Sequence, residues 1–105
     1  MKYNLLELKK ELKEELTHNI LPFWMDKVKD DNGGFFGQMT GQNELQKSAA
    51  RGGILNARIL WTFSSAARIL GNDAYKAAAE HAKNYIFDHF FDPEFGGTYW
   101  MLNAD

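Results

Sequence analysis

Hydrophobic positions in the first part of the chain predict a long amphipathic helix from Asn4 to about Lys29. Charged residues fill one side of this stretch, and apolar residues recur on the other at helical spacing, at Leu5, Leu8, Leu12, Leu16 and Ile20. This one-sided pattern favours a helix that lies against other helices with its charged side in water. Because Pro22 has no backbone N–H, we expect a kink or a restart between Thr17 and Leu21.

A second helix is predicted from Arg51 to Leu70, and it is apolar round most of its circumference. Its densest apolar arc contains Leu55, Ile59, Phe63, Ala66 and Leu70. A helix of this kind is usually buried, yet Arg58 stands in its middle. A guanidinium group stays charged and needs oxygen partners, so the simplest interpretation is an Arg whose stem packs while its head pairs with a nearby carboxylate or carbonyl.

A third helix is predicted from Ala74 to Phe91, after Gly71 has ended the second and with Asp73 placed as its cap. Small residues along one side allow another helix to approach closely. His81 and His89 lie in this stretch and are acid or base candidates by residue type alone. A lone His on a helix is more often hydrogen-bonded or at the surface.

Two acidic turns with paired glycines follow the first and the third helix. Their sequences are Asp30-Asp31-Asn32-Gly33-Gly34 and Asp92-Pro93-Glu94-Phe95-Gly96-Gly97. Each precedes aromatic residues, and we expect residues 35–39 to be extended and 41–48 to form a surface loop. The glycine pairs lie 63 residues apart. A repeated unit of helix, loop and helix, with outer amphipathic and inner apolar helices, indicates an all-α fold of the α/α toroid type.

Composition narrows the function classes. The 105 residues are 45% hydrophobic and 14% aromatic, which is typical of one packed domain. A net charge of -2 offers no nucleic-acid surface, and the absence of cysteine excludes disulfides and thiolate metal sites. No apolar run reaches the ~20 residues that span a bilayer, and no signal-peptide core is present, so we expect no membrane partner and a cytoplasmic protein. The first acidic turn lacks calcium-loop spacing, and no metal is expected.

Four motifs resemble those of the N-acylglucosamine 2-epimerase family, and of the cellobiose 2-epimerases within it. The segment from Leu55 to Ser64 closely resembles the family's first signature. The other three stand in the same order as in the family and are Asn19-Ile20-Leu21-Pro22-Phe23-Trp24, Gly33-Gly34-Phe35-Phe36-Gly37 and Gly96-Gly97-Thr98-Tyr99-Trp100. The family folds as an (α/α)6 barrel, so the resemblance implies that residues 1–105 form its N-terminal part. Six units would need about 350 to 400 residues, which makes the barrel incomplete in this chain.

The resemblance also implies a chemistry. Family members invert C2 of a reducing-end sugar through a cis-enediolate, with two His residues on later helices as base and acid. His18, His81 and His89 do not match those positions. Arg58 matches the Arg that stabilises the developing negative charge, and Asn56 would orient Arg58 or the substrate. Tyr99 and Trp100 would form a sugar-stacking surface, with loop packing as the alternative. No cofactor is expected, and the partner is a carbohydrate, either a disaccharide or an N-acylated monosaccharide.

Two other classes stay open at this point. An α/α-toroid glycoside hydrolase would need two carboxylates about 5 to 9.5 Å apart, for which Asp30, Asp31, Asp92 and Glu94 are the candidates. A non-catalytic binding module or self-associating remnant is the other class. The helix from Arg51 to Leu70 has more apolar surface than two neighbouring helices can cover. We therefore expect the segment alone to self-associate. We also expect it to be inactive as an enzyme, because the resemblance places the catalytic acid and base on helices that these 105 residues do not include.

Overall fold

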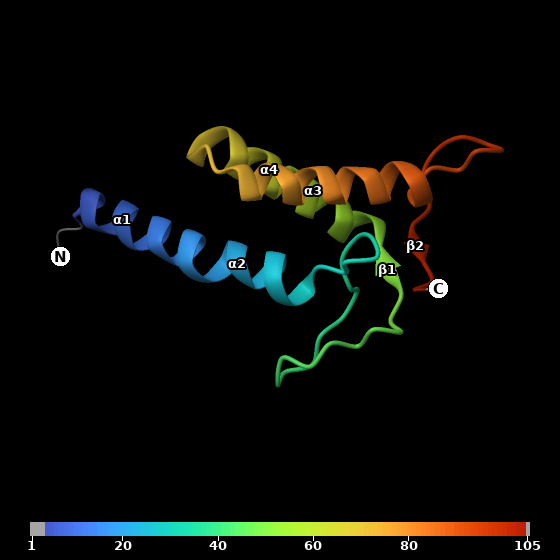
Figure 1. The fold of residues 1–105 in the computed structure, drawn as a ribbon, viewed down its shortest axis with the longest axis horizontal. Helices are drawn as coiled ribbons and strands as arrows, with labels where there is room; N and C mark the ends of the chain where they lie inside the picture. The colour runs from blue at the N-terminus through green and yellow to red at the C-terminus, as the bar shows by residue number, and fades with distance from the viewer. Residues whose placement is uncertain (1–3, 105) are drawn as a thin grey trace.

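The computed structural model describes residues 4–104 as a mostly helical chain, and the predicted all-α class is confirmed. A long N-terminal helical segment leads through loops into an antiparallel pair of helices, and the loops gather at one end of the molecule (Figure 1). The molecule is elongated, with principal extents of 55 × 31 × 27 Å. Within residues 4–104, no helix combines the length and apolar character needed to cross a lipid bilayer.

The N-terminal segment stays helical through Pro22 but changes from α-helix to π-helix before it. It consists of α1 (Leu5–Glu15), the π-helical turn η1 (Leu16–Ile20), α2 (Leu21–Phe23) and a second π-helical turn, η2 (Trp24–Val28). The predicted irregularity between Thr17 and Leu21 takes the form of η1, after which the α-helix restarts at Leu21 with Pro22 in its first turn. The wider π-helical turn before Pro22 moves the preceding carbonyl away from the proline ring and accommodates the missing donor. At the start, the Asn4 side chain caps α1 by accepting from the N–H groups of Leu6 and Glu7.

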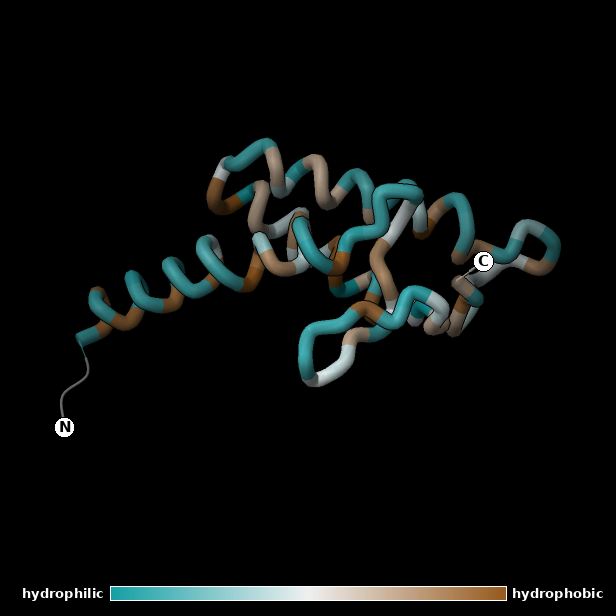
Figure 2. Tube along the Cα trace, turned by 60° about the horizontal axis from the view of Figure 1, so that its bottom comes forward, coloured by the Kyte–Doolittle hydropathy of each residue, from teal (hydrophilic) through white to brown (hydrophobic). Residues whose placement is uncertain are grey.

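The leucine face of α1 lies open instead of against other helices. None of its residues is buried, and Leu6 is 79% exposed. Figure 2 shows this half of the helix projecting beyond the rest of the chain, with apolar and polar residues alternating along it. Burial begins only at Leu21 and continues at Val28. The predicted packing of the whole N-terminal helix is thus wrong for α1, because no element among residues 4–104 covers it.

The central pair consists of α3 (Gly53–Leu70) and α4 (Asp73–Tyr85), which continues into the π-helical turn η3 (Ile86–Phe90). As predicted, Gly71 ends α3, in the left-handed conformation with φ 72°. The cap of α4 is Asn72 and not Asp73, because the Asn72 side chain accepts from the Ala74 N–H at 2.8 Å. The two helices approach closely because α4 presents small buried side chains, Ala78, Ala79 and Ala82.

The core lies between one face of α3, α4, the second half of the N-terminal segment and Phe35. Phe35 and Phe63 stack with centroids 6.4 Å apart, and both are almost fully buried. The opposite face of α3 carries three exposed large side chains, Ile54, Trp61 and Ile69. The helix that the sequence predicts to be apolar all round is therefore covered on one side only.

The two acidic turns are repeats in three dimensions. The Asp30 N–H donates to Gly34 O and the Asp92 N–H to Gly97 O, each at 3.0 Å. All four paired glycines have positive φ, and a single antiparallel bridge closes each loop. In the first turn the Tyr85 ring lies where a Cβ on Gly34 would be, only 2.7 Å from it. The predicted repeat is confirmed.

Short extended segments connect the turns to the helices. Isolated bridges hold Phe35 to Lys29 and Met39 to Leu45. Residues 41–48 are mostly exposed, as the sequence predicts for a surface loop. The only two-stranded ladder within residues 4–104 joins β1 (Arg51–Gly52) to β2 (Met101–Leu102) in antiparallel register, with Arg51 opposite Leu102. This ladder brings the start of α3 beside the segment that follows the second acidic turn.

Candidate functional site

The start of α3 lies in close contact with the segment just before β2. The Gly53 N–H donates to Trp100 O at 2.9 Å. A Cβ on Gly53 would lie 3.0 Å from Tyr99 O and 3.3 Å from Trp100 O, so the glycine permits this approach. The Asn56 Nδ2 donates to Gly52 O at 2.7 Å and fixes the first turn of the helix.

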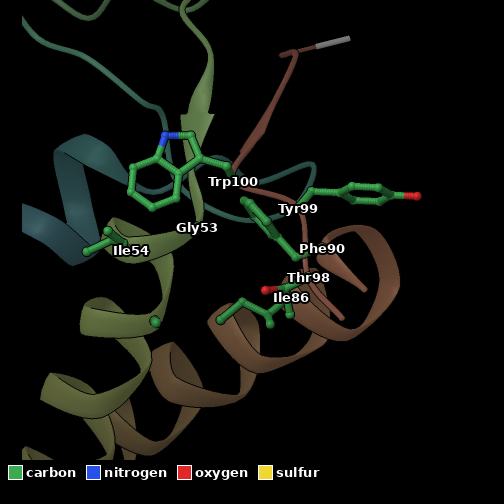
Figure 3. Close-up of a pocket in the computed structure, with 8 residues that line it drawn as sticks. Gly53, Ile54, Ile86, Phe90, Thr98, Tyr99 and Trp100 are labelled. Atoms are coloured by element: carbon green, nitrogen blue, oxygen red, sulfur yellow. The ribbon is translucent and has the colours of Figure 1, made fainter. Parts of the chain in front are cut away.

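A cavity of about 350 Å³ opens where α3, η3 and the segment before β2 meet. Its lining is mostly apolar and consists of Gly53, Ile54, Ala57, Ile86, Phe90, Thr98, Tyr99 and Trp100. In Figure 3 the Trp100 indole extends over the start of α3 towards Ile54, while the Tyr99 ring points away from the cavity. Trp100 is therefore the better placed of these two residues to stack on a ligand in the cavity.

A second cavity of about 520 Å³ adjoins the first along α3. It is lined by Ile54, Ala57, Arg58, Trp61 and Thr62, and it shares the first two residues with its neighbour. Arg58 is exposed there and makes no ion pair within residues 4–104. The simplest sequence interpretation, a guanidinium paired with a nearby carboxylate or carbonyl, is wrong for this residue, which has no such partner within residues 4–104. Its charge is free to act on a ligand.

The four predicted site residues are thus only partly brought together. Arg58 and Trp100 lie on adjoining cavities, and Tyr99 contributes to the lining of one of them. Asn56 is fully buried, so its side chain does not reach a ligand, and it acts through the first turn of α3. Its Oδ1 has no partner within residues 4–104.

The sequence pattern assigned no function to two residues near the site, Trp61 and Arg51. Trp61 is 71% exposed and borders the Arg58 cavity, where its indole offers a flat apolar face. Because Trp61 is apolar and stands in a helix predicted to be buried, the sequence suggested that it packs against the core. Arg51 is the other, and it is the Arg that the fold buries. No local signal identifies it, because its carboxylate partner lies 21 residues earlier.

The Arg51 guanidinium is enclosed on four sides. Its Nη2 donates to Asp30 Oδ2 at 2.5 Å and its Nη1 to Gly33 O at 2.8 Å. The guanidinium carbon lies 5.3 Å from the Phe36 ring centroid and 5.2 Å from that of Tyr85. Burial alone would raise the pKa of Asp30, but hydrogen bonds from Arg51 and the Asn32 N–H, with the positive charge of Arg51, lower it below its ordinary value.

The histidines show no arrangement for proton transfer at the cavities. The His81 Nε2 lies 2.9 Å from Asp30 O and 2.8 Å from Gly34 O, which ties α4 to the first acidic turn. His89 is exposed beside the Tyr85 ring, and His18 is exposed on η1. Neither His81, His89 nor His18 lines the two cavities on α3.

The acidic residues hold loops. The Asp30 carboxylate pairs with Arg51, and the Asp92 Oδ1 accepts from the N–H groups of Glu94 and Phe95. None of the four candidate carboxylates lines either cavity on α3, so neither cavity has the carboxylate pair that a glycoside hydrolase needs. Within residues 4–104, no group of three His, Asp or Glu side chains could hold a metal ion.

Sequence comparison shows that the chain is similar to proteins described as sugar 2-epimerases. The sequence profile of the family described as N-acylglucosamine 2-epimerase (GlcNAc 2-epimerase) matches residues 34–105. A cellobiose 2-epimerase from Bacteroides fragilis is 58% identical over 97 residues, which cover 91% of this chain and 25% of that protein. A cellobiose 2-epimerase from Ruminococcus albus is 44% identical over 95 residues, which cover 90% and 24%.

Solved structures agree with the sequence comparison. The cellobiose 2-epimerase of Spirochaeta thermophila DSM 6192 matches with a TM-score of 0.88 at 34% identity, over 96% of this chain and 25% of that one. The cellobiose 2-epimerase of Bacillus thermoamylovorans B4167 matches with a TM-score of 0.86 at 39% identity, over 90% and 24%. The predicted fold, helical hairpins of an (α/α)6 toroid, is confirmed for the part that this chain forms. The chain spans about a quarter of the length of these relatives, and it belongs to the N-acylglucosamine 2-epimerase family.

Proposed function

We propose that the protein acts as a sugar 2-epimerase of the cellobiose 2-epimerase type. The observation that carries the proposal is the free Arg58 guanidinium beside an apolar cavity bordered by Trp61, in a chain that is 58% identical to a cellobiose 2-epimerase over most of its length. A cation in an aromatic-lined, mostly apolar cavity suits a sugar, whose C–H face packs on an indole while its oxygens accept hydrogen bonds.

The reaction proceeds in two proton transfers. A base removes the C2 proton of the open-chain aldehyde, and the electron pair moves onto the carbonyl oxygen to give a cis-enediolate. An acid then returns a proton to C2 on the opposite face. Arg58 donates to the oxygen that gains negative charge, and a fixed cation lowers the barrier because it needs no reorganisation at that moment.

The acid and the base are two His residues outside residues 1–105. Residues 1–105 supply charge stabilisation and sugar contacts, and the two His residues elsewhere in the toroid transfer the proton. Trp100 stacks on the sugar, Tyr99 lines the same cavity, and Asn56 keeps the first turn of α3 in place. No cofactor is needed for this chemistry, and a cytoplasmic location stays a prediction.

The full-length protein tests the proposal when it is incubated with cellobiose in D₂O. We expect a disaccharide with mannose configuration at the reducing end and one deuterium at C2. N-acetylglucosamine, tested in parallel, is expected to react less well, since the relatives named above are cellobiose 2-epimerases. Unchanged cellobiose without deuterium at C2 would contradict the proposal, and release of free glucose would restore the hydrolase alternative.

We also propose that the 105-residue segment alone is inactive and self-associates. Its accessible surface is 7794 Å², whereas a compact monomer of 12.0 kDa exposes about 6000 Å². The radius of gyration of 15.9 Å likewise exceeds the ~13 Å expected for a compact domain of this length. The excess surface includes the leucine face of α1 and the exposed face of α3. In isolation, a second copy would cover part of it as a symmetric dimer.

A further inference from the structure

Arg51, the partner of Asp30, lies in the strand that connects the two sides of the first cavity through its backbone. Arg51 is the first residue of β1, and α3 begins two residues later. We call residues 53–57 the helix wall and residues 98–100 the hairpin wall of this cavity. The backbone of Arg51 pairs with Leu102, just after the hairpin wall, so one residue is linked to both walls.

The two residues after Arg51 make short polar contacts, one with each wall of the cavity. On one side, Gly52 O accepts from Asn56 within the helix wall at 2.7 Å. On the other, the Gly53 N–H donates to Trp100 O at 2.9 Å. A displacement of Arg51 along or across β1 would therefore shift the start of α3 relative to Trp100.

The anchor that holds Arg51 is itself fixed by three bonds. The Asp30 Oδ1 accepts from the Asn32 N–H at 2.9 Å, the Asp30 N–H donates to Gly34 O, and the His81 Nε2 lies 2.9 Å from Asp30 O. The side chains of Arg51 and Asp30 are 4% and 13% exposed. A buried ion pair adds little stability relative to well-packed apolar residues, so its main effect is to impose one arrangement.

We propose that Arg51, held by Asp30, is a positioning residue that sets the separation of the helix wall and the hairpin wall and thereby the fit of the sugar. Its link to sugar fit rests on the proposed epimerase function, whereas its effect on wall geometry does not. Arg51 is not a catalytic residue in this proposal, because it lines neither cavity on α3 and its guanidinium contacts Asp30, Gly33 and two aromatic rings.

Two readouts on the full-length protein test the proposal. The first is the ¹⁹F NMR signal of Trp100 in protein labelled with 5-fluorotryptophan, assigned as the signal that Trp100→Phe removes. The second is the KM and kcat for cellobiose. The variants are Arg51→Lys, which keeps the charge but loses the two-point fork, and Asp30→Asn, which keeps the shape but loses the charge.

The matched control is Asp31→Asn. Asp31 is the adjacent carboxylate, its side chain is 96% exposed, and its contact with Lys29 is at the surface. We expect Arg51→Lys and Asp30→Asn to move the Trp100 signal and to raise KM by roughly tenfold or more, with a smaller change in kcat. Asp31→Asn should leave both readouts unchanged.

The proposal is overturned if both variants lower the melting temperature while the Trp100 signal and KM stay at wild-type values. If Arg51→Lys gives no folded protein, Asp30→Asn decides alone, because it removes the charge that holds the guanidinium and keeps the shape of the side chain. The same shift of the Trp100 signal is then expected, and its absence refutes the proposal. If the wild-type protein does not epimerise cellobiose, the epimerase function fails and the Trp100 signal alone decides the positioning role.

Discussion

The Nη2 of Arg51 lies 2.5 Å from the Oδ2 of Asp30, although 21 residues separate them in the chain. This pair joins the first acidic turn to the strand that leads into α3. Around it, Gly34 and Tyr85 pack so closely that the turn, α4 and β1 form one unit. The stability of this unit and the placement of the cavity are therefore expected to change together.

The first prediction concerns acid stability. The pKa of Asp30 in the folded protein lies below its value of about 3.9 in the unfolded chain. The Asp30–Arg51 pair therefore stabilises the fold fully at pH values above about 3.9. This stabilisation is lost as the pH falls from there through the folded-state pKa. At pH 7, Asp30→Asn should lower the free energy of unfolding by about 3 kcal/mol. The difference between variant and wild type should shrink towards pH 2.5. Urea titrations at both pH values measure it, and an equal difference at the two would exclude this role of the charge.

A second prediction tests the close packing at the first turn. Gly34 has φ +67°, and a Cβ there would lie 2.7 Å from the Tyr85 ring. Gly34→Ala should therefore destabilise the fold by roughly 2–4 kcal/mol, from left-handed strain and overlap together. Gly41 is the matched control, because a Cβ there meets nothing within 4 Å. Equal melting temperatures for Gly34→Ala and Gly41→Ala would show that the turn is not packed against Tyr85.

The third prediction separates the covered face of α3 from the exposed face of α1. Phe63 is 2% exposed, and Phe63→Ser should destabilise by at least the ~3–5 kcal/mol that a Phe-to-Ala change costs in a core. Lys13→Ala should stay within ~0.5 kcal/mol of wild type. In the isolated segment Leu12→Ala should also be mild, because Leu12 is 62% exposed. Chemical denaturation compares the three, and similar losses at Phe63 and Lys13 would contradict the core assignment.

A fourth prediction addresses self-association of the isolated segment. Light scattering should give twice the 12.0 kDa mass of one chain. Trp61→Lys, on the exposed face of α3, should shift the population towards monomer because it places a charge in the interface. Phe95→Ser is the control, since Phe95 is also aromatic and, at 83%, even more exposed, but lies in the second acidic turn. A monodisperse 12.0 kDa species with cooperative unfolding would refute the dimer.

Local patterns predicted the helices and turns well. The paired glycines and Gly71 all adopt the left-handed conformation, because positive φ is a local demand that only a few residue types meet. The helix-loop-helix repeat follows from the same signals. The cap of α4 was misplaced by one residue, since Asn72 and Asp73 are both good caps and sequence alone does not rank them.

Features that depend on distant residues were beyond the sequence pattern. The chain offers Arg51 and Arg58 as candidates for a buried cation. Arg51 is the one that is buried, because Asp30, Phe36 and Tyr85 contact it from three separate segments. The exposure of the α1 leucines is a second example, because periodicity shows that a face is apolar but not which element covers it. Pro22 predicted an irregularity between Thr17 and Leu21, but no residue type there predicts that it takes the form of a π-helical turn.

Turnover of Arg58→Ala in the full-length protein tests the central claim most directly. Arg58→Ala should lower kcat for cellobiose epimerisation by roughly 10²-fold or more, because a fixed donor to the enediolate oxygen is lost. The melting temperature should hardly change, since Arg58 is exposed and makes no ion pair within residues 4–104. Arg68→Ala, an exposed cation in the last turn of the same helix and outside both cavities, should keep wild-type kcat. A variant at Arg58 that keeps most of its kcat, or that loses activity only because it unfolds, would contradict the account.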